Sequence, residues 1–229
     1  MAAIEARLMA SRQVYEFPQD HIRLDLIGTA RDLLQKVFNF QAVQLTVSTG
    51  IIFSRGTWHR SADSPVVAIR RLQIEPRLII IDVDGGSDLI PGIFEFLVNC
   101  LKEIRTSEPT PLIGEYERVY DHSEISCRLD FEPNALLSPT LVRIVGDLPS
   151  MSGDAGEVGF VPVITVSRAR QTEEFGTTTP LEARADYQIT LRVGTRPADR
   201  VFFSAAPLSS SDHLRFLDEL NSELSQNPA

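Results

Sequence analysis

Three aspartates near the middle of the chain have the residue type and spacing for metal chemistry. Asp82 and Asp84 occupy alternate positions at the end of an apolar run, in the segment RLIIIDVDGGSDLIPG, and Asp88 follows shortly after them. Carboxylates that leave a strand end together can bind a hard cation such as Mg²⁺. A structural interpretation competes with this one, because Asp84 can open a glycine turn and Asp88 can cap a helix.

The stretch LIIIDVDGGSD resembles the first motif of the haloacid dehalogenase superfamily, in which two aspartates serve as phosphoryl acceptor and acid/base around Mg²⁺. The resemblance implies a metal-assisted phosphohydrolase or phosphotransferase that uses Asp82 and Asp84. The sequence departs from the family pattern, since Gly86 precedes Ser87 where the family has Thr or Ser directly after the first glycine. The only downstream lysine is Lys102, and the rest of the chain is mainly β. We therefore favour a turn with no metal site and no catalytic residue, and keep the metal site as the alternative.

A basic island covers residues 54–77, where five arginines face only Asp63 and Glu75. The single tryptophan lies within it, so aromatic and guanidinium groups could bind an anion, a nucleic-acid base or a partner carboxylate. A lone tryptophan in a hairpin more commonly covers the edge of the core. The candidate binding residues are Arg55, Trp58, His59, Arg60, Arg70 and Arg71.

The whole-chain composition restricts the partners and the compartment. The chain has 229 residues, an ordinary globular composition and a formal net charge of -9, which disfavours nucleic acid and anionic membranes. No apolar stretch is long enough to span a bilayer, and the N-terminal segment lacks the apolar core of a secretory signal. Cys100 and Cys127 suit buried hydrophobic positions, and no cofactor is expected. We predict a cytoplasmic protein without a membrane partner, and a surface position for His213.

Three segments have the periodicity or capping residues of helices. Apolar residues recur at three and four positions within 20–38, which predicts an amphipathic helix. A second helix is predicted for 88–105, with Ser87 or Asp88 as its cap, and a third for 211–225, with Ser210 or Ser211 as its cap.

Alternation and β-branched residues indicate strands in most of the remaining chain. The segment VVAIRRLQIEPRLIIIDV predicts two strands joined at Glu75-Pro76, and residues 146–159 predict a long exposed, mobile loop rich in glycine. Further strands are predicted in QAVQLTVSTGIIFSRG, YERVY, EISCRLDF, VPVITVSRA, ADYQITLRV and RVFFSAAP.

These patterns predict an α+β fold with an antiparallel or mixed β-sheet packed against about three helices. Each half of the chain reads as strands followed by an apolar-faced helix, which leaves open two related α/β subdomains. The predicted division places an N-terminal α/β subdomain at 1–108 and a mainly β subdomain with a closing helix at 109–229.

The function that this pattern favours is a non-enzymatic cytoplasmic binding or assembly protein, because no clustered acid/base pair or phosphate loop stands out. The second half has many strands and one helix to cover them, so an exposed sheet face or edge predicts a protein partner or a homodimer. Two alternatives stay open: the metal-assisted enzyme that uses Asp82 and Asp84, and anion or nucleic-acid binding through the Arg55–Arg71 island.

Overall fold

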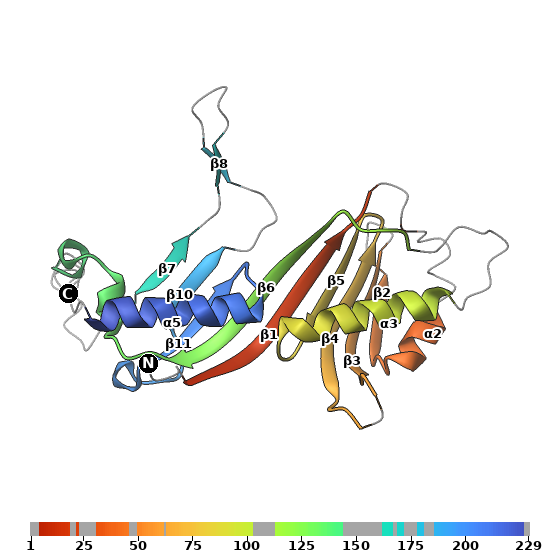
Figure 1. Cartoon of the computed structure of the whole chain (residues 1–229), viewed down its shortest axis with the longest axis horizontal. Coiled ribbons are helices and arrows are strands. Elements are labelled where there is room, and N and C mark those ends of the chain that lie inside the picture. The colour runs from red at the N-terminus through yellow and green to blue at the C-terminus, as the bar shows by residue number, and fades with distance from the viewer. Residues whose placement is uncertain are drawn as a thin grey trace. The chain divides into compact units, whose positions relative to one another are not determined.

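A nine-stranded antiparallel sheet forms the centre of the computed structural model, which confirms the predicted α+β class (Figure 1). The strand order is β2-β3-β4-β5-β1-β6-β11-β10-β7, and β8 pairs with β9 separately. The structure describes residues 5–18, 22, 31–45, 50–61, 63–102, 113–143, 162–166, 169–171, 178–180 and 186–226. The predicted loop at 146–159 lies outside these residues.

Strands β4 and β5 are joined by a two-residue turn at Pro76-Arg77, next to the join that the sequence predicts at Glu75-Pro76. The strands are β1 (Glu5–Glu16), β2 (Ala42–Leu45), β3 (Ile51–Trp58), β4 (Val67–Glu75), β5 (Leu78–Val83), β6 (Arg118–Arg128), β7 (Val163–Val166), β8 (Ala169–Gln171), β9 (Thr178–Pro180), β10 (Tyr187–Leu191) and β11 (Val201–Ala206). The helices are α2 (Arg31–Val37), α3 (Ile90–Lys102) and α5 (Ser210–Gln226), with short 3-10 turns η2 (Ser87–Leu89), η3 (Pro133–Leu136) and η4 (Pro197–Asp199).

Strand β1 was not predicted, although it lies near the middle of the sheet. Its inward positions include Ser11, Gln13 and Tyr15, so the usual apolar alternation is missing. Polar bonds satisfy these buried groups: the Tyr15 hydroxyl donates to Gln13 Oε1 at 2.7 Å, and Gln13 Nε2 donates to Asp121 Oδ1 at 2.8 Å. A buried polar chain of this kind replaces the apolar pattern that identifies a strand.

The two halves of the sheet repeat one arrangement. The first half runs from β1 to α3 and the second from β6 to α5. In each half, the last strand along the chain, β5 or β11, is the neighbour of the first strand, β1 or β6, in the sheet. A helical segment is the next element after that last strand. β5 and β11 have the same burial sequence, half-buried at their first and third residues and buried at the other four. These matches concern the arrangement of the elements, since the residues themselves differ, and the relation between two α/β subdomains stays a prediction.

Serines at matching places strengthen this correspondence. Ser11 of β1 donates to the carbonyl of Gly85 at 2.7 Å, and Ser123 of β6 donates to the carbonyl of Leu208 at 3.0 Å. Each acceptor lies two residues before the serine at the start of the following helical segment, Ser87 or Ser210. In each half, a serine of the first strand therefore hydrogen-bonds to the connection between the last strand and the helical segment.

The predicted helices agree with the structure in two of three cases. α3 follows η2 and α5 closes the chain, close to the predicted 88–105 and 211–225. The prediction of a helix from residue 20 was wrong at Ile22, which forms an isolated antiparallel bridge with Ile113. The described helix here, α2, is seven residues long.

Two strand predictions also needed correction. The segment QAVQLTVSTGIIFSRG contains two strands, β2 and β3, which pair antiparallel with each other. YERVY and EISCRLDF belong to one strand, β6.

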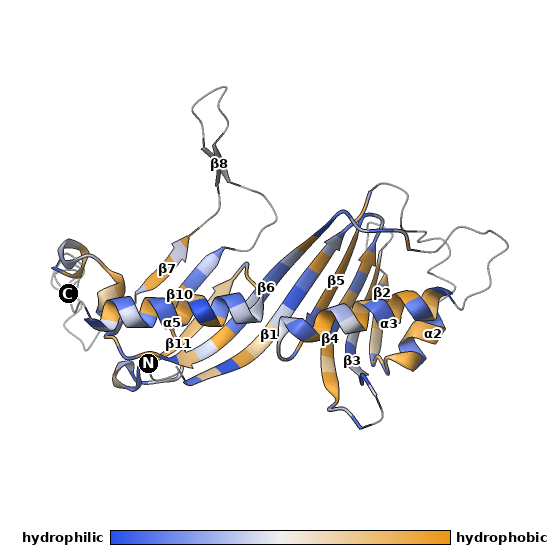
Figure 2. Cartoon of the chain, in the orientation of Figure 1, coloured by the Kyte–Doolittle hydropathy of each residue, from blue (hydrophilic) through white to orange (hydrophobic). Residues whose placement is uncertain are grey.

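Helix α5 differs from α3 in its hydropathy, since α3 is mainly hydrophobic and α5 carries many hydrophilic residues (Figure 2). It buries His213, Leu217 and Asn221. Asn221 is satisfied by Asp130, because its Oδ1 accepts from the Asp130 backbone N–H at 2.7 Å and its Nδ2 donates to the carboxylate at 3.0 Å. The buried side of α5 is therefore held partly by polar bonds.

The chain divides into two compact units. One contains Leu8–Ser123 and Leu208–Ser210, and the other contains Met1–Arg7, Glu124–Pro207 and Ser211–Ala229. The predicted boundary at residue 108 lies outside the described residues and stays a prediction.

Candidate functional site

Asp82 is held by arginine on the neighbouring strand. It lies on β5 and is 8% exposed, and Arg12 of β1 is its partner in register. Arg12 donates to both carboxylate oxygens, from Nε to Oδ1 at 2.5 Å and from Nη2 to Oδ2 at 2.9 Å. Arg71 of β4 lies opposite Asp82 on its other side. This carboxylate is therefore part of a charge-assisted contact between strands.

Asp84 lies just beyond the end of β5 and pairs with Arg70. The register of β4 against β5 shifts between Ile69 and Arg71, so Arg70 is the extra residue of a bulge. A bulge redirects a side chain out of the regular alternation. Asp88 is exposed on η2. Among the described residues, no group of three or more His, Cys, Asp or Glu side chains could hold a metal ion, and the metal-assisted alternative stays a prediction.

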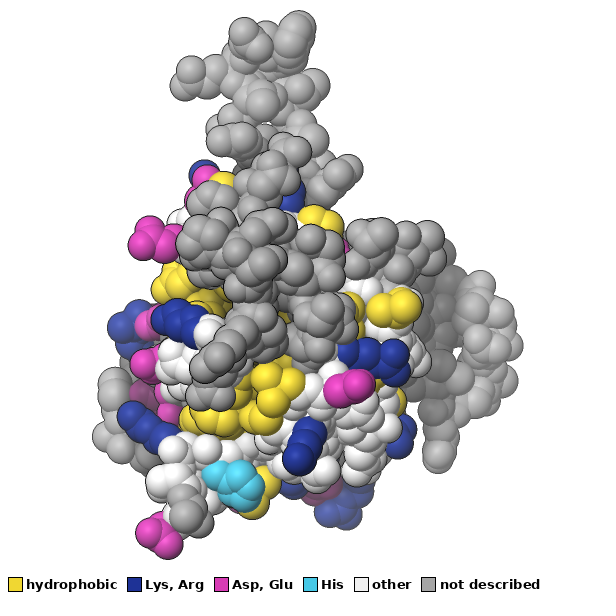
Figure 3. Space-filling model, turned by 90° about the vertical axis from the view of Figure 1, so that its right-hand side faces the viewer, with side chains coloured by type: hydrophobic (Ala, Val, Ile, Leu, Met, Phe, Trp, Pro, Cys, Tyr) yellow, Lys and Arg dark blue, Asp and Glu magenta, His cyan; other side chains and the backbone are white. Residues whose placement is uncertain are grey.

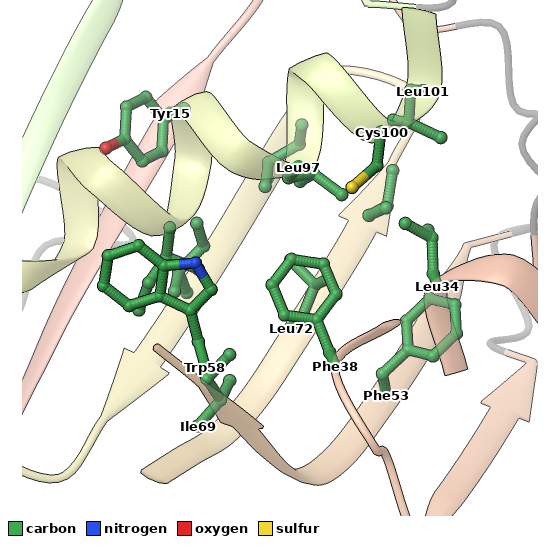
Figure 4. Packing of buried hydrophobic residues seen from close by; sticks show 14 of the residues in the cluster. Tyr15, Leu34, Phe38, Phe53, Trp58, Ile69, Leu72, Leu97, Cys100 and Leu101 are labelled. Atoms are coloured by element: carbon green, nitrogen blue, oxygen red, sulfur yellow. The ribbon is translucent and has the colours of Figure 1, made fainter. Parts of the chain in front are cut away.

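Trp58 belongs to the hydrophobic core, as the hairpin interpretation predicted. Its indole lies against α3, in a cluster with Ile69, Leu72 and Leu97 (Figure 4). A Cβ added at Gly92 of α3 would lie 3.0 Å from the ring, which shows how closely the helix approaches it. The face of Trp58 is consequently covered by protein.

The other residues of the basic island are distributed over several environments. Arg55, His59, Arg60 and Arg70 are exposed, whereas Arg71 is half-buried and donates to Gln73. Acidic and basic side chains are interspersed on the face of the molecule in Figure 3, with hydrophobic side chains between them. The structure does not place Trp58 with these arginines on one surface, and binding by the exposed members stays a prediction.

A buried serine–histidine pair was missed by sequence reasoning. Ser204 of β11 and His213 of α5 are both fully buried, and their Oγ and Nε2 atoms are 2.9 Å apart. Ser204 Oγ also lies 3.1 Å from the carbonyl of Gln188, to which it can donate. The predicted surface position of His213 was wrong, because this residue is fully buried three positions after Ser210, as Ile90 is three positions after Ser87.

Burial also raises the pKa of acidic groups in this part of the core. The pKa of Cys127 is raised to about 12 by burial. The pKa of Tyr187 is also raised to about 12 by burial, against a lowering contribution from Ser204. Both groups are therefore protonated at neutral pH, and the Cys127 thiol has little nucleophilic character.

Strand β7 lies at one end of the strand order of the nine-stranded sheet. β7 pairs with β10 on one side through Val163, Ile164, Thr165 and Val166. In the described part of the chain, no strand lies on its other side. Val163 and Val166 are each 55% exposed, and the strand carries no charged side chain. Such an edge offers backbone N–H and C=O groups to an added strand.

The first half shows how an equivalent edge is covered. Ile164 of β7 faces Ile189 of β10, just as Phe53 of β3 faces Leu72 of β4. β3 has a further antiparallel neighbour, the four-residue strand β2. The corresponding place beside β7 has no described strand, which the sequence could not reveal because strand order is set by long-range pairing.

No protein-family model matches this chain, and no curated protein matches it. None of the described helices combines the length and hydropathy needed to cross a membrane.

Proposed function

We propose that this protein is a non-enzymatic binding or assembly protein that forms a homodimer by pairing the outer edges of β7. The observation that supports it most is the uncovered, uncharged edge of β7, at a place where the first half carries the additional strand β2. A second copy suits this edge because one surface can meet itself across a two-fold axis, with antiparallel strands.

The residues of β7 favour pairing with a similar strand. All four are β-branched, and Val163 and Val166 expose about half of their surface. Cross-strand contacts between branched side chains stabilise paired strands, and an uncharged edge carries no repulsion against its own copy. The opposite edge, β2, also exposes Leu45 but contains Gln44.

The length of β7 sets the expected affinity. Four residues can supply only a few interchain hydrogen bonds and a contact smaller than the roughly 1,200 Å² of a stable interface. We therefore expect a reversible dimer with a dissociation constant of about 1–100 μM. The buried thiols Cys100 and Cys127 suit the proposed cytoplasmic location, where cysteines stay reduced.

Light scattering across this concentration range tests the proposal with matched variants. Val163→Glu and Val166→Glu place like charges at the pairing edge, and we expect each to shift the mass to that of a monomer. Val193→Glu is the control, because Val193 is a nearly fully exposed valine in the turn after β10. A wild-type protein that stays monomeric throughout, or a dimer that Val193→Glu weakens equally, would contradict the proposal.

A further inference from the structure

Three arginines from distant parts of the sequence line one cavity in the unit that contains α5. Its volume is about 500 Å³, and Arg7 of β1, Arg128 of β6 and Arg192, just after β10, all line it. Ala6, Cys127 and Val201 contribute apolar surface to the same cavity. It is distinct from the basic island of residues 54–77.

The three guanidinium groups are in different bonding states. Arg192 Nη1 donates to Ser126 Oγ at 3.1 Å, and Ser126 is 5% exposed, so this arginine is tied to a buried hydroxyl that also lines the cavity. Arg7 and Arg128 form no hydrogen bond or salt bridge with the residues that the structure describes. Their donors are available to an anion.

The acids of the cavity leave an excess of positive charge. Glu5 and Asp199 line it with the three arginines. Asp199 is already engaged by Arg196, which donates to its two carboxylate oxygens from Nη2 at 2.9 Å and from Nε at 3.2 Å. The pKa of Asp199 is lowered mainly by these bonds, with a smaller contribution from Arg128. A positive cavity on a chain of net charge -9 concentrates anions locally.

We infer that this cavity binds a small ligand through a phosphate group. Guanidinium groups pair with phosphate oxygens through forked hydrogen bonds, and a phosphate offers more oxygens to three arginines than a single carboxylate does. The volume exceeds that of inorganic phosphate, so the apolar lining suits a phosphate ester with an organic part.

Calorimetry with inorganic phosphate and pyrophosphate at constant ionic strength tests this inference on the full chain. We expect saturable binding that Arg7→Gln and Arg128→Gln each weaken roughly tenfold, since each removes a charged donor. Arg215→Gln is the matched control, because Arg215 is an exposed arginine on α5 that pairs with Asp212 and does not line the cavity. The affinity of this variant for phosphate and pyrophosphate should equal that of the wild type.

Two results would overturn the inference. One is the absence of saturable binding of both probes up to about 10 mM, which would leave only non-specific attraction. The other is equal weakening by Arg215→Gln, which would show that total charge and not this cavity determines the binding. Because Arg7 and Arg128 make no bonds to described residues, these variants are expected to fold normally.

Discussion

At the scale of single residues, polar groups of types that occur in active sites make contacts between the elements of the fold. Asp82 is buried between Arg12 and Arg71 of the adjacent strands, and Ser204 and His213 bond to each other inside the core. The sequence shows the residue types but not these partners, because each partner lies far away in the chain. The turn at Asp84 and the core position of Trp58 were predictable, since they depend on local turn chemistry and on a lone aromatic in a hairpin.

Replacing Asp82 should destabilise the fold. Asp82→Asn removes the buried charge that accepts two hydrogen bonds from Arg12, and we expect a loss of roughly 1–3 kcal/mol in the free energy of unfolding. Asp84→Asn is the control, because Asp84 and Arg70 are both about half exposed and the expected loss is below about 1 kcal/mol. Urea unfolding of the two variants measures the difference. Equal losses would contradict the structural role assigned to Asp82.

The Cys127 thiol predicts a specific alkaline instability. Burial raises its folded-state pKa from 9.0 to about 12, so the folded chain keeps the proton that the unfolded chain releases above pH 9. The stabilising contribution is complete below pH 9 and is lost progressively as the pH rises towards 12. From pH 8 to pH 10 the thiol should account for roughly 1–2 kcal/mol of lost stability.

Cys127→Ala isolates this effect. The variant should lose less stability than the wild type between pH 8 and pH 10, whatever its stability at pH 8. Urea midpoints at the two pH values give the comparison. A pH dependence identical to that of the wild type would show that the thiol ionises as readily in the folded chain.

At the scale of elements, the connections into α3 and α5 share one polar junction. Ser87 N–H donates to Ser210 Oγ at 2.7 Å and Ser210 N–H donates to Ser87 Oγ at 3.0 Å. Ser11 Oγ lies 3.0 Å from Ser210 Oγ. The sequence predicts Ser87 or Asp88 and Ser210 or Ser211 as helix caps, whereas the residue in the cap position of η2 is Gly86, without a side-chain cap bond. The reciprocal contact between Ser87 and Ser210 depends on the tertiary fold.

Removing the Ser210 hydroxyl should therefore cost more than the loss of an ordinary cap. Ser210→Ala leaves the buried Ser87 N–H and Ser11 hydroxyl without this partner, and we expect a loss of about 2 kcal/mol. Ser225→Ala, at an exposed position near the end of the same helix, should change stability by less than about 0.5 kcal/mol. Thermal or urea unfolding compares the two, and similar effects would argue against the junction.

Strand prediction succeeded where apolar or β-branched residues alternate, as in β4, β5, β10 and β11. It failed at β1, where Ser11 and Gln13 are buried with hydrogen bonds, and at the start of the predicted helix at residue 20, where Ile22 pairs with Ile113. In both places tertiary contacts override the local pattern. The edge of β7 was likewise outside the reach of sequence, because it depends on the order of all nine strands.

At the scale of the whole molecule, a palindromic order of eight strands is extended by one further strand. Without β2, the order β3-β4-β5-β1 of the first half is followed by the corresponding strands of the second half in reverse, β6-β11-β10-β7. The first strands of the two halves, β1 and β6, are adjacent in this order, and a helix follows the last strand of each half. β2 covers one end of this order and gives the sheet its asymmetry. The proposed homodimer would supply to β7 the type of neighbour that β2 supplies to β3.

Hydrogen exchange of the β7 backbone as a function of protein concentration tests the proposed homodimer most directly. In a monomer the outward amides of Val163–Val166 face no described strand and should exchange quickly, whereas in a dimer they donate to the partner. We predict that exchange in a peptide covering β7 slows as concentration rises through about 1–100 μM. Exchange in the opposite edge, β2 (Ala42–Leu45), should stay constant. Exchange at β7 that does not change with concentration would contradict pairing between copies through this edge.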